Sequence, residues 1–239
     1  MSGHSKWATT HRAKEIVDAK RGAAFTKISN VITIAARKGG DPATNFALAT
    51  AVDRARGVNM PKDNIERAIK RGTGELEGAT LEELVYEAVG PANSQFVIKL
   101  LTDNKNRTAA EVRHLLSLHG ASMGAVLWNF DLKGVIRVSA DIAAAKGIDS
   151  DEGQLELIDA GADDVKKEAE GLTVLTSGAN LQKVKAYLEG KGVATESAEI
   201  EYVAKDTIEV SGEDSAKIEG LTGALEDNED VSDYYSNLK

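Results

Sequence analysis

The sequence 95-QFVIKLLTDNKNRTAAEVRHLLSLHGA-121 predicts a strand, a polar turn and a helix in direct succession. The apolar run Gln95–Thr102 is typical of a buried strand. Thr108, followed by Glu111 three residues later, matches the capping-box pattern of a helix start. Val126–Phe130 is predicted to be the strand that returns along the sheet. This stretch therefore indicates a β-α-β unit.

The same order of strand, helix and strand recurs twice in the rest of the chain. The predicted segments are Gly171–Thr176, Leu181–Glu189 and Glu199–Val203 in one unit, and Thr207–Ser211, Ser215–Glu226 and Val231–Tyr235 in the other. Because a single helix per unit must cover one face of a sheet, small ferredoxin-like β-α-β sandwiches with antiparallel sheets are the economical architecture. We expect two sandwiches, the last unit returning to complete the first.

Upstream of these units the sequence predicts three amphipathic helices. Apolar residues recur at steps of three and four in Lys20–Lys38, in Asn45–Arg56 and in a third segment that starts at Pro61. Gly72 is expected to close the third helix. The short connection between the second and third helices is similar to that of a helix-turn-helix domain.

These patterns predict an α+β multidomain protein with an N-terminal three-helix domain followed by two small sandwiches. The expected domains are a basic helical domain at residues 1–78, an α+β domain formed by 79–133 with 205–239, and an inserted α+β domain at 134–204. At 239 residues the chain is long enough for more than one core.

Charge is distributed very unevenly along the chain. Residues 1–71 carry fourteen Lys and Arg against six Asp and Glu, a balance of +8, whereas residues 72–239 have a balance of −17. A basic module joined to an acidic body can hold a polyanion on one face, which points to nucleic acid. The predicted contact residues are His4, Lys6, His11, Arg12, Lys14, Lys20, Arg21, Lys27, Arg37, Lys38, Arg54, Arg56, Lys62, Arg67, Lys70 and Arg71.

The turn 103–108 is the other candidate site. Asn104, Lys105 and Arg107 are not needed for the predicted cap at Thr108. They could reach RNA, fix the angle between the helical domain and the body, or simply form a polar turn. The sequence leaves these alternatives open.

Several classes of function lack a sequence signature. There is no cysteine, which excludes disulfides and thiolate chemistry and fits a reducing compartment, so the cytoplasm is the simplest location. No nucleophile elbow, phosphate-binding glycine loop or metal-ligand spacing is present. We therefore expect no enzyme activity, no cofactor and no metal. The sequence shows no signal peptide and no membrane-spanning segment.

Several strings of sequence carry a resemblance to a known family. GHSKWA at 3–8, NMPKDNIERAI at 59–69 and TDNKNRT at 102–108 resemble the YebC family, which includes the mitochondrial translational activators of cytochrome oxidase. The resemblance extends over nearly the whole chain. It implies an N-terminal helical domain and two α+β domains.

The resemblance implies two different functions, and the charge pattern favours one of them. The family is described both as DNA-binding transcriptional regulators and as factors that act on the ribosome to help translation through difficult sequences. Lys and Arg spread over three helices suit phosphate tracking better than base recognition. We therefore expect binding to ribosomal RNA, with regulation through double-stranded DNA as the alternative.

Two further points stay open at the level of sequence. A metabolite-sensing module is suggested by fold analogy alone, because small β-α-β sandwiches also serve as ligand-binding regulatory domains. The sequence does not fix the oligomeric state, and a monomer is the simpler expectation.

Overall fold

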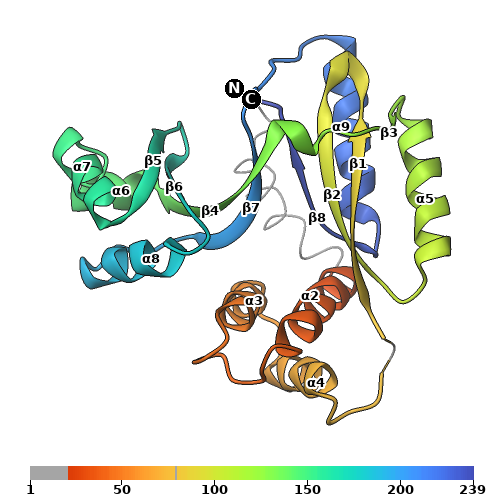
Figure 1. Cartoon of the computed structure of the whole chain (residues 1–239), viewed down its shortest axis with the longest axis horizontal. Helices are drawn as coiled ribbons and strands as arrows, with labels where there is room; N and C mark the ends of the chain where they lie inside the picture. The colour runs from red at the N-terminus through yellow and green to blue at the C-terminus, as the bar shows by residue number, and fades with distance from the viewer. Residues whose placement is uncertain (1–20, 79) are drawn as a thin grey trace. The chain divides into compact units, whose positions relative to one another are not determined.

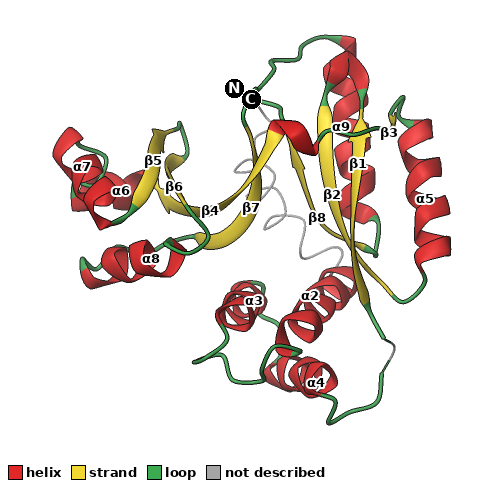
Figure 2. Cartoon of the chain, viewed as in Figure 1, coloured by secondary structure: helices red, strands yellow, loops and turns green. Residues whose placement is uncertain are grey.

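The computed structural model describes residues 21–78 and 80–239 of the chain (Figure 1). The chain folds into two compact units, one made of the residues up to Asn129 together with Ala204–Lys239, the other of Phe130–Val203. The second unit is thus an insertion in the first. The first unit contains both helices and strands (Figure 2).

From residue 21 onward, where the description of the structure begins, three helices form the N-terminal module of the first unit. They are α2 (Arg21–Ala36), α3 (Phe46–Gly57) and α4 (Lys62–Thr73). Their shared core contains Ile32, Leu48, Val52 and Ile65, so the predicted apolar stripes do face inward. Asn45 joins α2 to α3: its Nδ2 donates to the Ala35 and Gly39 carbonyls at 2.8 and 2.7 Å, and its Oδ1 accepts from the Leu48 amide.

The prediction for Gly72 is wrong in an informative way. Gly72 lies inside α4, and the helix ends at Thr73, followed by Gly74 in the left-handed conformation. A Cβ at Gly72 would lie 2.4 Å from the Thr33 carbonyl oxygen and 2.6 Å from the Ala36 Cβ. Gly72 is therefore the point at which α4 touches α2, and glycine is needed there for close approach.

The first sandwich is a four-stranded sheet with the order β3-β1-β2-β8. Its strands are β1 (Glu82–Val89), β2 (Gln95–Thr102), β3 (Ser122–Met123) and β8 (Val231–Ser236), and all neighbouring pairs are antiparallel. The helices are α5 (Lys105–Leu118) and α9 (Glu213–Asp227). Leu116 of α5 and Leu221 of α9 pack with Phe96, Ile98 and Leu100 of β2 in one core. Both helices thus cover the same face.

The inserted unit contains a second sheet, with the order β5-β6-β4-β7. In chain order its elements are β4 (Phe130–Ser139), α6 (Ala140–Lys146), α7 (Asp151–Ala160), β5 (Ala162–Lys167), β6 (Gly171–Thr176), α8 (Leu181–Gly190) and β7 (Ser197–Ala204). Counted within the unit, the strand order is 4-1-3-2. This is the ferredoxin-like order, which confirms the predicted fold class.

The two sheets differ in how their strands are connected. In the inserted unit the two central strands are joined to the outer ones, whereas in the first sandwich the central strands β1 and β2 form a hairpin through η1 (Pro91–Asn93). The two sheets are therefore connected in different ways.

Two predicted strands are absent. Residues 126–130 instead contain the short helix η2 (Leu127–Asn129), whose end is fixed because the Asn129 side chain donates to Gln95 and to the Asp206 carbonyl. Residues 207–211 contribute only one bridge, from Ile208 to Leu238. Neither segment therefore forms a continuous ladder of backbone hydrogen bonds with a neighbouring strand. Side-chain hydrogen bonds hold residues 126–130, and a single bridge holds residues 207–211.

Replacing Gly72 by alanine tests the close approach of α2 and α4. The new methyl group would overlap the Thr33 carbonyl and the Ala36 side chain, so we expect a loss of about 1–3 kcal/mol in the free energy of unfolding by urea. Gly57→Ala is the control, since nothing lies within 4 Å of its added Cβ. That variant should be unchanged or more stable by up to about 1 kcal/mol. Equal stability of both variants would contradict the contact.

Candidate nucleic-acid interface

Four basic residues gather where α2 and α4 end. Arg37 and Lys38 follow directly on α2, and Lys70 and Arg71 lie in the last turn of α4. We call these four residues the α2/α4 basic cluster. All four are exposed. The helix dipole favours cations at the carboxyl ends of helices, so the positions of these four residues at the ends of α2 and α4 are electrostatically favourable.

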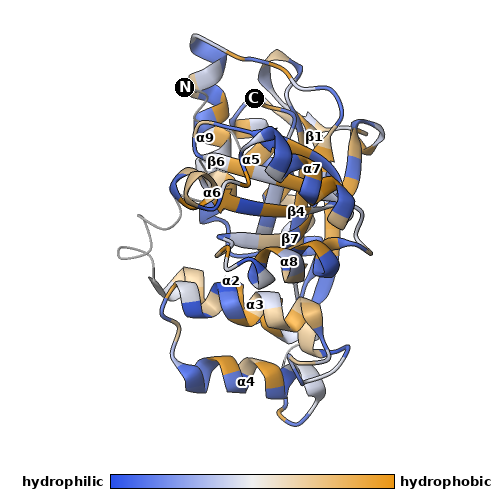
Figure 3. Cartoon of the chain, turned by 90° about the vertical axis from the view of Figure 1, so that its left-hand side faces the viewer, coloured by the Kyte–Doolittle hydropathy of each residue, from blue (hydrophilic) through white to orange (hydrophobic). Residues whose placement is uncertain are grey.

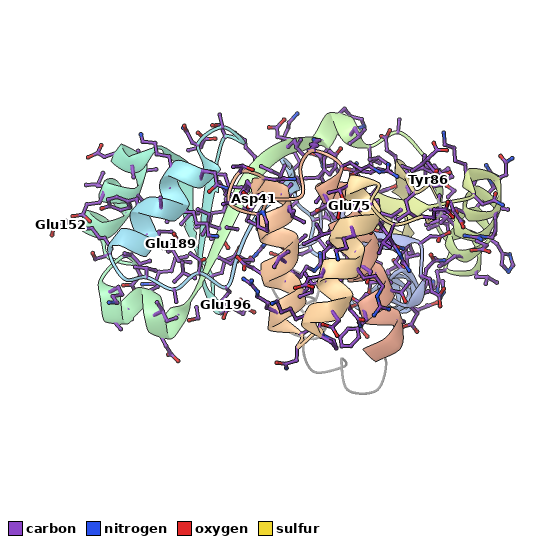
Figure 4. The ribbon with its side chains drawn as sticks, turned by 90° about the horizontal axis from the view of Figure 1, so that it is seen from below. Asp41, Glu75, Tyr86, Glu152, Glu189 and Glu196 are labelled. Atoms are coloured by element: carbon purple, nitrogen blue, oxygen red, sulfur yellow. The ribbon has the colours of Figure 1, made fainter. Side chains whose placement is uncertain are left out.

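Contacts between the two helices bring the members of the cluster together. Besides Gly72, a Cβ on Gly40 would lie 3.5 Å from Ile69 and 2.7 Å from Thr73, so the loop after α2 also touches α4. Asp41 and Glu75, which follow the two helix ends, are labelled in Figure 4. Helix α4 carries both hydrophilic and hydrophobic residues along its length (Figure 3), and Ile65 and Ala68 are the buried ones.

The α2/α4 basic cluster has no carboxylate partner among residues 21–78 and 80–239. Every ion pair within 4.0 Å that those residues form involves other side chains. Arg67, one turn earlier on α4, is likewise exposed and unpaired within that part of the chain. These five cations are therefore available to an external polyanion.

Other predicted contact residues of the module have partners within the protein. Arg56 pairs with Asp53 at 3.3 Å and Lys62 pairs with Glu66 at 3.4 Å. Arg54 reaches Asp233 of β8 at 3.4 Å. The structure thus divides the predicted set into paired and unpaired members.

Lys27 also has a partner within the protein. Its Nζ donates to the Glu226 carbonyl oxygen at 2.5 Å, and the side chain is half-buried. Burial lowers the pKa of Lys27 to about 8, although the charge of Asp233 acts in the opposite direction. This lysine connects α2 to the end of α9.

The remaining predicted contacts lie at the N-terminus. His4, Lys6, His11, Arg12, Lys14 and Lys20 are outside the described residues. Arg21 is the first residue of α2.

A groove adjoins the α2/α4 basic cluster. It has a volume of about 290 Å³, and its walls include Arg37 and Arg71. Sequence reasoning missed its other lining residues, Asn30 and Thr33 on α2 and the segment after α4. The spacing of 30, 33 and 37 at helical intervals was the available signal.

The turn 103–108 differs from the capping-box prediction. Helix α5 begins at Lys105, three residues earlier than predicted, and the Asn104 side chain accepts from the Arg107 amide at 3.1 Å. Thr108 is completely buried, with its Oγ1 2.5 Å from Asp230 Oδ2 and 2.8 Å from Thr102 Oγ1. Thr108 therefore ties the helix to β2 and to the start of β8.

The candidate residues of this turn all have partners inside the first sandwich. Arg107 lies within 4.0 Å of the carboxylates of Asp103, Glu111 and Asp230. Its hydrogen bond to Asp230, followed by the charge of that residue, raises the pKa of Arg107. Lys105 pairs with Glu82. Asn104 is the helix cap, as shown above.

The described residues contain neither a metal-binding cluster nor a membrane-spanning helix. Among residues 21–78 and 80–239, no group of three or more His, Asp or Glu side chains is placed to hold a metal ion. No helix in this part of the chain has the length and apolarity required to cross a bilayer.

The protein is an α+β multidomain protein. It combines a helical module, which carries the α2/α4 basic cluster, with two ferredoxin-like sandwiches, one inserted in the other. Comparison with known families then identifies the chain as a member of the TACO1/YebC family. The model of the TACO1/YebC N-terminal domain matches residues 5–75, and the model of the second and third domains matches residues 81–238.

Relatives match over the full length of the chain. A probable transcriptional regulatory protein of Thermoanaerobacter pseudethanolicus is 46% identical over all of this chain and 97% of its own length. One from Pseudothermotoga lettingae is 49% identical over all of this chain and 94% of its own. The crystal structure of a conserved hypothetical protein from Aquifex aeolicus has a TM-score of 0.80 at 40% identity and covers 93% of this chain and 92% of that one.

Substitution of Thr108 by valine tests the buried link between α5, β2 and β8. The change keeps the shape of the side chain but leaves the Asp230 carboxylate without its contact to Oγ1. We expect a loss of about 1–3 kcal/mol in unfolding free energy. Lys105→Ala, which breaks only the exposed pair with Glu82, should change it by less than about 1 kcal/mol. A neutral Thr108→Val would show that the link is unimportant.

The lowered pKa of Lys27 predicts a pH dependence of stability. Between pH 8 and 10.5 the folded protein has lost this proton while the unfolded chain still holds it, so unfolding takes up a proton and stability rises with pH. In Lys27→Met that part of the rise should vanish, whereas Lys62→Met should retain it. Urea titrations at pH 7.5 and 10 measure the difference. Parallel behaviour of wild type and Lys27→Met would refute the prediction.

Proposed function

We propose that this protein is a non-enzymatic, nucleic-acid-binding regulator of gene expression that acts on translation in the cytoplasm. In this proposal it associates with the ribosome through ribosomal RNA and helps translation through difficult sequences. One observation carries the proposal: the α2/α4 basic cluster presents Arg37, Lys38, Lys70 and Arg71 with no carboxylate partner in the described residues.

The position of the charge on the helices supports RNA as the ligand. Helix-turn-helix proteins contact bases mainly with the N-terminal residues of one recognition helix. In the N-terminal half of α4, Asp63 and Glu66 offset the charges of Lys62 and Arg67, so this half has no net positive charge for DNA phosphates. The free cations instead lie at the carboxyl ends of two helices. Such a cluster suits the irregular phosphate backbone of folded RNA.

The acidic remainder of the chain also fits this proposal. The balance of −17 over residues 72–239 opposes contact with nucleic acid. It leaves the sandwiches to face solvent or basic proteins, of which the ribosome has many. Positive charge on the helical module and negative charge on the remainder would orient the protein on a surface that presents both RNA and basic protein.

Regulation through double-stranded DNA is the second candidate. It is favoured by the relatives at 46% and 49% identity, which are named probable transcriptional regulatory proteins. In that case Asn64 and Arg67, both on α4, would contact base edges in a major groove.

Replacing Lys70 and Arg71 together by alanine tests the proposal. Binding to structured RNA should weaken to a similar degree for all sequences, and the slope of log K against log salt should fall by roughly one unit per lost contact. Filter binding at several salt concentrations measures both quantities. Lys217→Ala with Lys239→Ala removes the same charge from the region after α8 and should change neither. Binding without salt dependence would overturn the proposal.

The two candidates differ in cellular partner and in specificity. We expect the full-length protein to co-sediment with ribosomes. If it acts on DNA instead, Arg67→Ala or Asn64→Ala should cost about 1–3 kcal/mol on a preferred site and little on random DNA. That result, with the protein recovered on promoter DNA and absent from ribosome fractions, would favour the second candidate.

A further inference from the structure

We propose that the groove beside the α2/α4 basic cluster binds one unpaired nucleotide of a folded RNA. In this arrangement Arg37 and Arg71 hold its phosphate, and the base lies against Leu76 and Leu81. This inference rests on the proposed function. It assigns a specific ligand, one nucleotide, to a surface that would otherwise bind RNA through charge alone.

The groove is built from two helices and the segment that follows them. Asn30 and Thr33 lie on α2, Arg37 follows it and Arg71 lies on α4. The remaining wall is formed by Gly74, Leu76, Glu77, Gly78, Thr80 and Leu81. The contact of Gly72 with Thr33 fixes the distance between the helices. The two arginines therefore project from a rigid crossing into a shared space.

The free polar groups of the groove match a nucleotide. Arginine has a planar set of donors that fits a phosphate and can also stack on a base. No described carboxylate lies within 4.0 Å of Arg37 or Arg71. The Asn30 side chain offers one acceptor and two donors. Thr33 is already used, because its Oγ1 contacts the Ser29 and Ala68 carbonyls at 2.8 and 3.2 Å.

Glu77 distinguishes a nucleotide from a simple phosphate. This carboxylate also lines the groove, and it would repel a second backbone phosphate. It accepts hydrogen bonds from an exocyclic amine or from a ribose 2′-hydroxyl. Donors for a phosphate, an acceptor for a base or sugar, and the side chains of Leu76 and Leu81 together correspond to the parts of one nucleotide.

The size of the groove sets the limit of the ligand. A volume of about 290 Å³ lies just below the roughly 300–1,000 Å³ typical of small-molecule sites. It admits one nucleotide but not a base pair within a helix. Proteins recognise RNA mainly through such unpaired bases in loops and bulges.

Hairpin RNAs with and without a single-nucleotide bulge test the inference on the full chain. We expect wild-type protein to bind the bulged hairpin about tenfold more tightly, the equivalent of one charge-assisted contact. The double variant Arg37→Ala with Arg71→Ala should lose this preference. Lys38→Ala with Lys70→Ala removes the same charge outside the groove, so it should weaken binding to both RNAs and retain the preference. Asn30→Ala should reduce the preference without changing the salt slope.

The possible failures are distinguishable. Equal wild-type affinity for both hairpins with steep salt dependence, or a preference that survives in the Arg37/Arg71 variant, would overturn the groove but leave the proposed function intact. Absence of any RNA binding would overturn both. Displacement of the bulged hairpin by micromolar nucleoside monophosphate would assign the groove to a free nucleotide and reject RNA as its source. Arg37, Lys38, Lys70 and Arg71 are exposed and Asn30 is half-buried. Unchanged thermal unfolding will confirm that each variant is folded.

Discussion

The close crossing of α2 and α4 at Gly72 is the constraint on which the helical module depends. A side chain at this position would meet the Thr33 carbonyl, so only glycine lets the two helices approach so closely. Because the crossing lies near the carboxyl ends of both helices, it also places Arg37 beside Arg71 in one groove. The absence of a side chain at Gly72 thus determines both the packing of α2 against α4 and the position of Arg37 beside Arg71.

A second level of organisation comes from the polar links that join α2 and α3 to the first sandwich. Lys27 donates to the end of α9 and Arg54 pairs with β8. These cations are used inside the protein, while those at the far ends of α2 and α4 remain unpaired within the described residues. A basic composition alone therefore overstates the surface that nucleic acid can reach.

Periodicity in the sequence was sufficient for the fold class and for most helices and central strands. The run Gln95–Thr102 coincides with β2, because a continuous apolar segment has few alternatives to a buried strand. Local polar signals were less decisive. Thr108 and Glu111 have the spacing of a cap, but Thr108 is drawn into a buried contact with Asp230, which is distant in sequence. Likewise, nothing local distinguishes paired Lys27 from unpaired Lys70, since their partners are set by tertiary structure.

The connectivity of the first sandwich has a consequence for biosynthesis. Phe96 of β2 pairs with Ser236 of β8, so this sheet has long-range contacts that raise the contact order. As the chain leaves the ribosome, the inserted unit is complete before β8 has emerged. Until then one edge of β2 is an open template in the nascent chain, the kind of edge at which strands from other molecules add. The last residues of the chain therefore protect one of its earliest strands.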